Sequence, residues 1–132
     1  MQQDLPIIKS FNIEKVMKIM NNKDNMDCVR YSCYMSNKKH EKFALDHCKK
    51  ILDPVSINIE DMNFIQCSSW SDNNHIAKIS HYNDFVWKNV KPYSFMEHDL
   101  FCYPVNNNYR KIWYLGDKDD YFCEHTDGRN TN

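Results

Sequence analysis

Glycine is nearly absent from this sequence, which contains only Gly116 and Gly128. Loops that wrap nucleotide phosphates need several glycines, because the backbone must approach the phosphate closely. Neither the dinucleotide-binding pattern G-x-G-x-x-G nor the P-loop pattern G-x-x-x-x-G-K-[ST] can be written here. The scarcity of glycine therefore excludes these two classes of nucleotide-binding loop.

Other absences narrow the range of functions and compartments. No apolar run approaches the roughly 20 residues that a membrane-spanning helix needs. The net charge of −1 is not that of a histone-like basic protein or an acidic tail protein. The first residues lack the basic and apolar regions of a signal peptide, and no Asn-x-Ser/Thr glycosylation site occurs. We therefore expect no membrane partner and a cytoplasmic or nuclear, reducing compartment, with secretion left open.

The sequence does contain enough bulky apolar material for one core. Its 132 residues include eight Tyr, seven Phe and three Trp, and 42% of all residues are hydrophobic. A chain of this length normally forms one domain, so we predict a single domain over residues 1–132. The 16 Asn and 14 Lys against 3 Arg indicate A-rich codons, which favour a viral, phage or mobile-element origin.

Hydrophobic spacing predicts two helices in the first half of the chain. Ser10 or Asn12 would cap the first helix, and the residues that recur at helical intervals are Ile13, Val16, Met17 and Met20. Ser36 or Asn37 would cap a second helix that stops before Pro54. We expect its inner face to consist of Phe43, Ala44, Cys48, Ile51 and Leu52.

Alternating apolar residues predict strands in several other segments. We expect strands within 28–35, 75–81 and 95–105, the last ended by Pro104, and a hairpin of 109–115 with 121–125 joined through Gly116. Residues 1–10 would be an extended lead-in with Ile7 and Ile8 in an edge strand or packed arm, and 126–132 a polar tail. The predicted fold class is α+β, with the two helices of the N-terminal half packed on one face of a curved antiparallel sheet formed mainly by the C-terminal half.

Six cysteines and six histidines raise the question of metal binding. The candidate zinc site consists of His98, Cys102, Cys123 and His125, because two short Cys/His pairs can supply four tetrahedral ligands. The alternative is that both cysteines are small buried hydrophobic residues and both histidines lie at the surface. Six cysteines would also allow three disulfides, but their irregular spacing and the absence of a signal peptide favour free thiols. A structural zinc ion is the one cofactor that this pattern suggests.

No catalytic constellation can be identified, so we name no catalytic residue. His75, His81 and His98 could act as acid and base beside Lys78, but nothing in their spacing fixes a geometry. Enzymatic activity therefore stays open, and a binding role is the simpler interpretation.

Aromatic and charged residues in the second half indicate binding. Tyrosine and tryptophan are good interface anchors, and an acidic loop could meet a basic partner. The candidate binding residues are Trp87, Tyr93, Tyr103, Tyr109, Arg110, Lys111, Trp113, Tyr114, Asp117, Asp119 and Asp120. We predict a small non-catalytic accessory or inhibitor protein that binds a host macromolecule, most plainly another protein. The alternative is a zinc-supported nucleic-acid-binding or nuclease-like module, because bases stack on aromatic rings while lysines hold phosphates. The sequence does not determine the oligomeric state.

Overall fold

The computed structural model describes residues 7–32 and 35–124 of the chain. The first helix, α1, spans Ile13–Asn21 and begins at the predicted cap, where Asn12 Oδ1 accepts a hydrogen bond from the Lys15 amide at 2.9 Å. Its buried residues, Val16, Ile19 and Met20, lie at helical spacing. The predicted start of this helix is therefore confirmed, and so are Val16 and Met20 on its inner face. Ile13 and Met17 are 49% and 48% exposed, so the prediction is wrong at these two positions.

The second helix, α2, spans Asn37–Cys48 and is capped by Ser36, as predicted. It ends earlier than expected because Lys49 adopts a left-handed conformation with φ 64°. Phe43, predicted to face inward, is 53% exposed, whereas Ala44 and His40 are buried. Ile51, also predicted to face inward, lies beyond the end of the helix and is 39% exposed, so the predicted inner face is wrong at Phe43 and Ile51.

Asn37 explains the orientation of α2. Its buried side-chain amide donates hydrogen bonds to the carbonyls of Leu115 and Asp117, at 3.1 and 2.6 Å. A buried amide needs such partners, so the positions that lie on its side of the helix, 40 and 44, face the sheet. Phe43 does not lie on the side of α2 that carries positions 40 and 44, and it faces outward.

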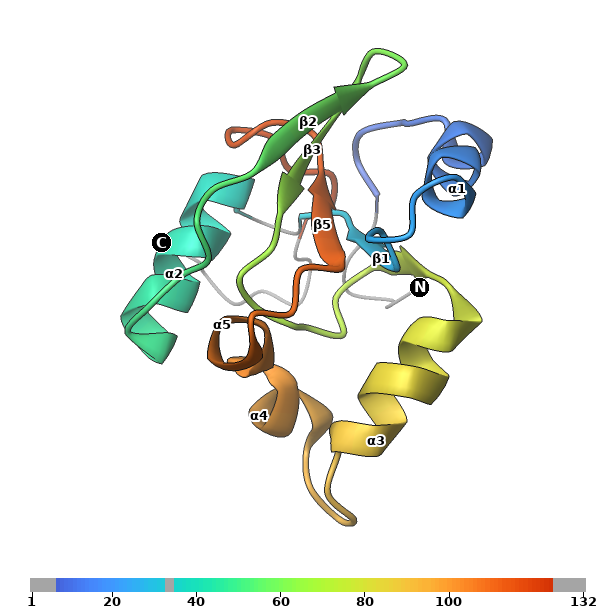
Figure 1. Cartoon of the computed structure of the whole chain (residues 1–132). Helices are drawn as coiled ribbons and strands as arrows, with labels where there is room; N and C mark the ends of the chain where they lie inside the picture. The colour runs from blue at the N-terminus through green and yellow to red at the C-terminus, as the bar shows by residue number, and fades with distance from the viewer. Residues whose placement is uncertain (1–6, 33–34, 125–132) are drawn as a thin grey trace.

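Five described strands form one open sheet in the order β2-β3-β5-β1-β4 (Figure 1). They are β1 (Cys28–Arg30), β2 (Ser56–Ile59), β3 (Met62–Gln66), β4 (His75–Ala77) and β5 (Ile112–Leu115). The predicted α+β class is confirmed, but only β4 and β5 come from the C-terminal half, so the expectation that this half forms most of the sheet is wrong. The sheet is mixed and not purely antiparallel, because β5 returns beside β1 in the parallel direction.

Helices cover both faces of the sheet. On one face α1 packs over Val29, Trp113 and Leu115. On the other, Cys28, Ile112 and Tyr114 meet side chains from residues 67–105, and the His40 ring of α2 stacks on Tyr114 with centroids 5.8 Å apart. The two N-terminal helices therefore lie on opposite faces, which differs from the predicted placement on one face. The reason is that every residue of β5 is buried, so both of its sides must be covered.

Residues 81–107 are helical where strands or no regular elements were expected. They form a π-helix, η1 (His81–Val86), continued by α3 (Trp87–Asn89), and then α4 (Met96–Leu100) and α5 (Tyr103–Asn107). The predicted strand 95–105 is wrong. Its Phe, Tyr and Val residues favour strands locally, but packing against the second face of the sheet overrides this preference. Pro104, read as the end of a strand, lies in the first turn of α5, where its missing N–H costs nothing.

The predicted hairpin of 109–115 with 121–125 is also wrong. β5 pairs with β3 and β1, while Cys123 forms an isolated antiparallel bridge with Ile7. The Ile8 amide donates to the Phe122 carbonyl at 2.8 Å, so residues 7–8 pack as an arm against the chain after β5. Gly116 has φ 89°, as a turn glycine should, and a Cβ there would lie 2.6 Å from the Asp120 carboxylate. Residues 1–6 and 125–132 lie outside the described residues.

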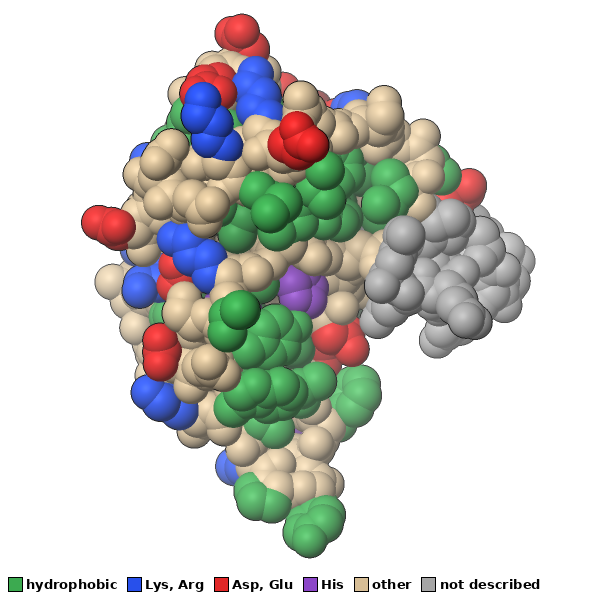
Figure 2. Space-filling view, turned by 90° about the vertical axis from the view of Figure 1, so that its right-hand side faces the viewer, with side chains coloured by type: hydrophobic (Ala, Val, Ile, Leu, Met, Phe, Trp, Pro, Cys, Tyr) green, Lys and Arg blue, Asp and Glu red, His purple; other side chains and the backbone are tan. Residues whose placement is uncertain are grey.

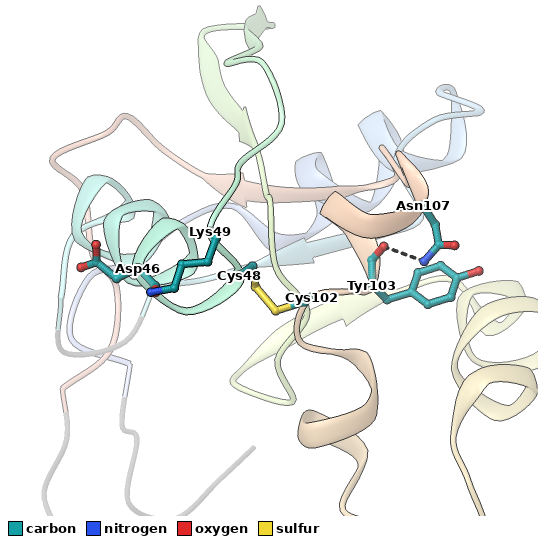
Figure 3. The surroundings of a disulfide bond; sticks show 6 residues. All are labelled: Asp46, Cys48, Lys49, Cys102, Tyr103 and Asn107. Atoms are coloured by element: carbon teal, nitrogen blue, oxygen red, sulfur yellow. Dashed lines mark hydrogen bonds between the residues drawn. A yellow bond between two sulfur atoms is a disulfide. The ribbon is translucent and has the colours of Figure 1, made fainter.

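One disulfide joins Cys48, at the end of α2, to Cys102, between α4 and α5 (Figure 3). The expectation of free thiols is wrong at these two positions. Cys28, Cys67 and Cys123 are free and buried, and Cys33 lies outside the described residues. Within 7–32 and 35–124, no helix is long and apolar enough to cross a membrane.

A buried histidine links the second face together. Trp70 Nε1 donates to His81 Nε2 at 3.3 Å, and the Tyr109 hydroxyl lies 3.4 Å from His81 Nδ1. Burial lowers the pKa of His81 from 6.5 to about 4. The acceptor nitrogen must be unprotonated to receive the Trp70 hydrogen bond, so protonation opposes folding.

Removing the disulfide should reduce stability strongly. The bond closes a loop with a sequence separation of 54, and constraining a loop of that length in the unfolded chain contributes about 4 kcal/mol. Urea unfolding of the Cys48→Ala/Cys102→Ala variant should show this loss, and reductant should lower the stability of the natural chain but not of the variant. A variant as stable as the natural chain would contradict the disulfide.

Stability should rise with pH between about 4 and 6.5 because of His81. In this window the unfolded histidine binds a proton that the folded one does not, and the full effect is at most about 3 kcal/mol. Unfolding of the natural chain and of His81→Gln across this range should differ in slope. Because Glu41 has a raised pKa, its slope has the opposite sign and is common to both proteins. An unchanged slope in His81→Gln would refute the assignment.

Candidate functional site

Four large apolar side chains between residues 79 and 95 face solvent. Ile79 is 80% exposed, Trp87 57%, Tyr93 109% and Phe95 68%. We call these four residues the apolar face. Figure 2 shows hydrophobic side chains gathered from the middle of that view down to its lower tip, where Figure 1 places the loop between α3 and α4. A single exposed leucine is ordinary at a protein surface, whereas several large exposed apolar residues in one short segment indicate an interaction site.

The helix formed by η1 and α3 divides its side chains between core and solvent. Phe85 and Val86 are buried in the cluster on the second face of the sheet. Trp87, the next residue, faces outward and contacts the Tyr82 ring, with centroids 5.5 Å apart. Phe85 and Val86 therefore supply the core contacts of this helix, and the Trp87 indole remains at the surface.

Tyr93 is held in an unfavourable backbone conformation. The Ser94 amide donates to the Lys91 carbonyl at 3.2 Å, which closes a turn with Pro92 and Tyr93 at its centre. Tyr93 has φ 62°, a value that glycine or asparagine normally supplies at this turn position. A left-handed conformation costs an ordinary residue about 1–2 kcal/mol.

Asp99 fixes the base of this turn. Its Oδ2 accepts a hydrogen bond from the Lys91 amide at 2.9 Å, and this bond holds the pKa of the Asp99 carboxyl below its ordinary value. The turn is thus attached to α4, and Tyr93 projects from a fixed base.

A pocket of about 470 Å³ adjoins the apolar face through Phe95. Its walls come from α2 on one side and from α4 with the residues flanking it on the other. Its lining includes Arg30, Phe43, Ser71, Phe95, Glu97 and Phe101. Aromatic walls with a few polar groups are typical of binding pockets.

Ring contacts and the disulfide hold the two walls together. Phe101 lies 5.7 Å from Phe43 and 5.1 Å from His47, both in edge-on arrangements. Cys102, which also lines the pocket, is covalently joined to Cys48 at the end of α2 (Figure 3). The separation of the walls is therefore fixed by a covalent bond as well as by packing.

The polar floor of the pocket is internally bonded. Arg30 donates from Nη1 to the Ser69 carbonyl at 3.1 Å, and its guanidinium lies over the Tyr114 ring. Ser71 donates from Oγ to Glu97 Oε1, which fixes the carboxylate at the pocket wall. Glu41 does not line the pocket, and its carboxylate accepts from the Ser68 amide and hydroxyl at 3.0 and 2.5 Å. Burial raises the pKa of Glu41, and the hydrogen bonds from Ser68 and the charge of Arg30 oppose this shift.

The structure separates the predicted aromatic binding residues into three pairs. Trp87 and Tyr93 belong to the apolar face. Trp113 and Tyr114 are 1% and 0% exposed and form the centre of the two cores. The remaining two, Tyr103 and Tyr109, are partly buried and pack on the Phe85 ring, with centroids 5.0 and 4.3 Å away.

The predicted charged binding residues have contacts within the chain. Arg110 donates to Gln66 Oε1 and Asn108 Oδ1, both at 2.8 Å, and Lys111 pairs with Asp27 at 3.5 Å. In the acidic loop, Asp117 accepts from Asn63, and Asp120 accepts from the Asp117 amide and from Lys9. Asp119 lies in the same turn and is exposed. These contacts stabilise the turn after β5, and none of these residues lies on the apolar face.

The candidate zinc ligands are not brought together among the described residues. His98 is exposed on α4, Cys102 is in the disulfide, and Cys123 is buried, with Asn74 Nδ2 3.4 Å from its sulfur. His125 lies outside the described residues. Within 7–32 and 35–124, no group of three or more His, Cys, Asp or Glu side chains is placed to hold a metal ion. A zinc site therefore stays a prediction, and with these ligands it would need the disulfide to be reduced.

The candidate acid–base residues are engaged in structural contacts. His75 Nδ1 lies 2.7 Å from the Asn73 carbonyl, and its Nε2 lies 2.8 Å from the Tyr82 hydroxyl. Lys78 pairs with Asp27 at 3.3 Å and donates to the Lys23 carbonyl. Burial lowers the pKa of His75, so the neutral ring is favoured.

No protein-family model matches the chain, and comparisons with curated proteins and with solved structures found no match.

Sequence reasoning missed Ile79 and Phe95 of the apolar face and the pocket beside it. Phe95 was read as the start of a strand, where a phenylalanine would normally face the core. The dipeptide Pro92-Tyr93 carried a usable signal, because proline favours the second position of a turn.

Replacing Tyr93 by glycine should not destabilise the protein. Relief of the left-handed strain, about 1–2 kcal/mol, offsets the greater freedom of glycine in the unfolded chain, about 0.5–1 kcal/mol. Urea unfolding should show stability unchanged or raised by about 1 kcal/mol. Tyr121→Gly, at an exposed tyrosine with an ordinary φ, is the matched control and should lose stability. A clear loss in Tyr93→Gly would show that the fold depends on this side chain.

Proposed function

We propose that this protein is a non-catalytic accessory protein that binds another protein through the apolar face. The observation that carries the proposal is Tyr93, a fully exposed aromatic residue kept in a left-handed conformation, in a segment that also exposes Trp87. Strain of this kind persists where it serves something other than the stability of the isolated fold. Tyrosine and tryptophan are also the residues most often found at the energetic centres of protein interfaces.

The charges around the apolar face favour a protein over a nucleic acid. Lys88 pairs with Asp84 at 3.5 Å, so its charge is opposed by a neighbour. Glu97 and Asp99 add two carboxylates on α4. A phosphate backbone needs uncompensated positive charge, and the chain as a whole carries a net charge of −1.

The partner is expected to bury the indole and the phenol together. Burial of large apolar side chains contributes about 25 cal/mol per Å², and aromatic residues bury 150–250 Å² each. Two such anchors, Trp87 on α3 and Tyr93 on the fixed turn, can support a specific interface with few additional contacts.

Site-specific photo-cross-linking tests this proposal. Tyr93 is replaced by the photoreactive amino acid p-benzoyl-phenylalanine, and the protein is irradiated in extract of its source cells. We expect one discrete protein adduct that is lost when Trp87→Ala is added, because both residues would contact the same partner. The matched control carries the same photoreactive residue at Tyr121, which is exposed but lies outside the apolar face, and it should not give this adduct.

The other outcomes contradict the proposal. An adduct that nuclease removes would favour the alternative function of nucleic-acid binding. An adduct with a second copy of this chain would show self-association. No adduct, or one that is insensitive to Trp87→Ala, would show that the apolar face is not the interface.

A further inference from the structure

The pocket and the apolar face meet at Phe95. Phe95 belongs to both, since it is 68% exposed and lines the pocket. Phe43, on the opposite wall, is 53% exposed. A partner that covers the apolar face would therefore also lie over the opening between these two rings.

The pocket combines aromatic rings with one fixed carboxylate. Phe43, Phe95 and Phe101 supply three rings, and Glu97 supplies the carboxylate that Ser71 holds in place. Aromatic rings attract a cation through the negative face of the π-system, and a neighbouring carboxylate adds direct charge attraction. Rings and a carboxylate around one opening thus favour a positively charged group with an apolar stem.

The positive charge of Arg30 opposes the preference of the pocket for a cation. Contacts of Arg30 within the chain offset part of this charge. Arg30 is 3% exposed, and its guanidinium donates to the Ser69 carbonyl and lies over the Tyr114 ring. Its charge also interacts with the Glu41 carboxylate on the same side of the sheet. Two imidazoles, His47 and His98, complete the charged or titratable lining on the helical walls, and His40 faces the sheet.

We propose that this pocket receives a lysine or arginine side chain of the partner. The inference rests on the proposed function, because it assigns a chemistry to the partner that the apolar face binds. The aliphatic stem of such a side chain would pack between Phe43 and Phe95, and its charged end would reach Glu97. The ligand is therefore a basic residue presented at a protein surface.

Nuclear magnetic resonance titration of the full chain at pH 8 tests the proposal with small probes. The probes are Nα-acetyl-lysine methylamide and its arginine, norleucine and glutamate counterparts. We expect the lysine and arginine probes to bind at least fivefold more tightly than norleucine, which has the same stem without the charge. Shift changes should centre on Phe43, Phe95, Glu97 and Phe101.

Glu97→Gln is the decisive variant, because glutamine can still accept the Ser71 hydrogen bond. It should weaken binding of the lysine probe about fivefold to tenfold and leave the norleucine probe within twofold, which shows that the pocket is intact. Glu60→Gln, at an exposed carboxylate of the β2–β3 turn, is the matched control and should change neither.

Three results would overturn the inference: preference for the glutamate probe, equal binding of lysine and norleucine, or no binding by any probe. None of them affects the cross-link from Tyr93, so the proposed function could stand while this inference fails. Conversely, selective lysine binding without any partner adduct would uphold the pocket chemistry and refute the proposed function.

Discussion

The fold depends on one central strand that must be covered on both sides. All four residues of β5, Ile112–Leu115, are buried, and their side chains alternate between the two cores. One helix, α1, is sufficient on the Trp113 side. The Tyr114 side takes α2 and most of residues 81–107. Phe85, Val86 and Leu100 supply the apolar contacts there, and this leaves Trp87 and Tyr93 outside the core.

The disulfide connects this packing to the candidate site. Because Cys48 ends α2 and Cys102 lies between α4 and α5, the bond joins the two helical walls of the pocket. On α4, Glu97 places its carboxylate at the pocket, where Ser71 donates a hydrogen bond to it. Asp99, on the same helix, fixes the base of the Tyr93 turn. The Tyr93 turn and the pocket therefore share one support, α4.

Prediction from the sequence was correct where a single residue determines the local backbone conformation. Asn12 and Ser36 mark the starts of α1 and α2, and Gly116 marks the turn after β5. The fold class follows from the change in hydrophobic period along the chain. The prediction failed at 95–105, where Phe, Tyr and Val favour strands but long-range packing selects helices.

The candidate site was only partly within reach of sequence reasoning. Trp87 and Tyr93 were among the predicted binding residues, but so were Trp113 and Tyr114, and no local pattern distinguishes an exposed aromatic residue from a core one. The pairing of Cys48 with Cys102 also depends on tertiary structure, because spacing alone does not determine disulfide connectivity. Phe43 lies one position from the buried Ala44, and the hydrogen bonds of Asn37 decide which of the two faces the sheet.

The central claim is that residues 79–95 form the surface that a protein partner covers. Hydrogen–deuterium exchange of the complex, compared with the free protein, tests it most directly. We expect slower exchange of backbone amides in 79–95 and in the segment around Glu97, with the β2–β3 hairpin at 56–66 unchanged. Protection confined to the hairpin or to the turn after β5, with 79–95 exchanging as in the free protein, would contradict the account.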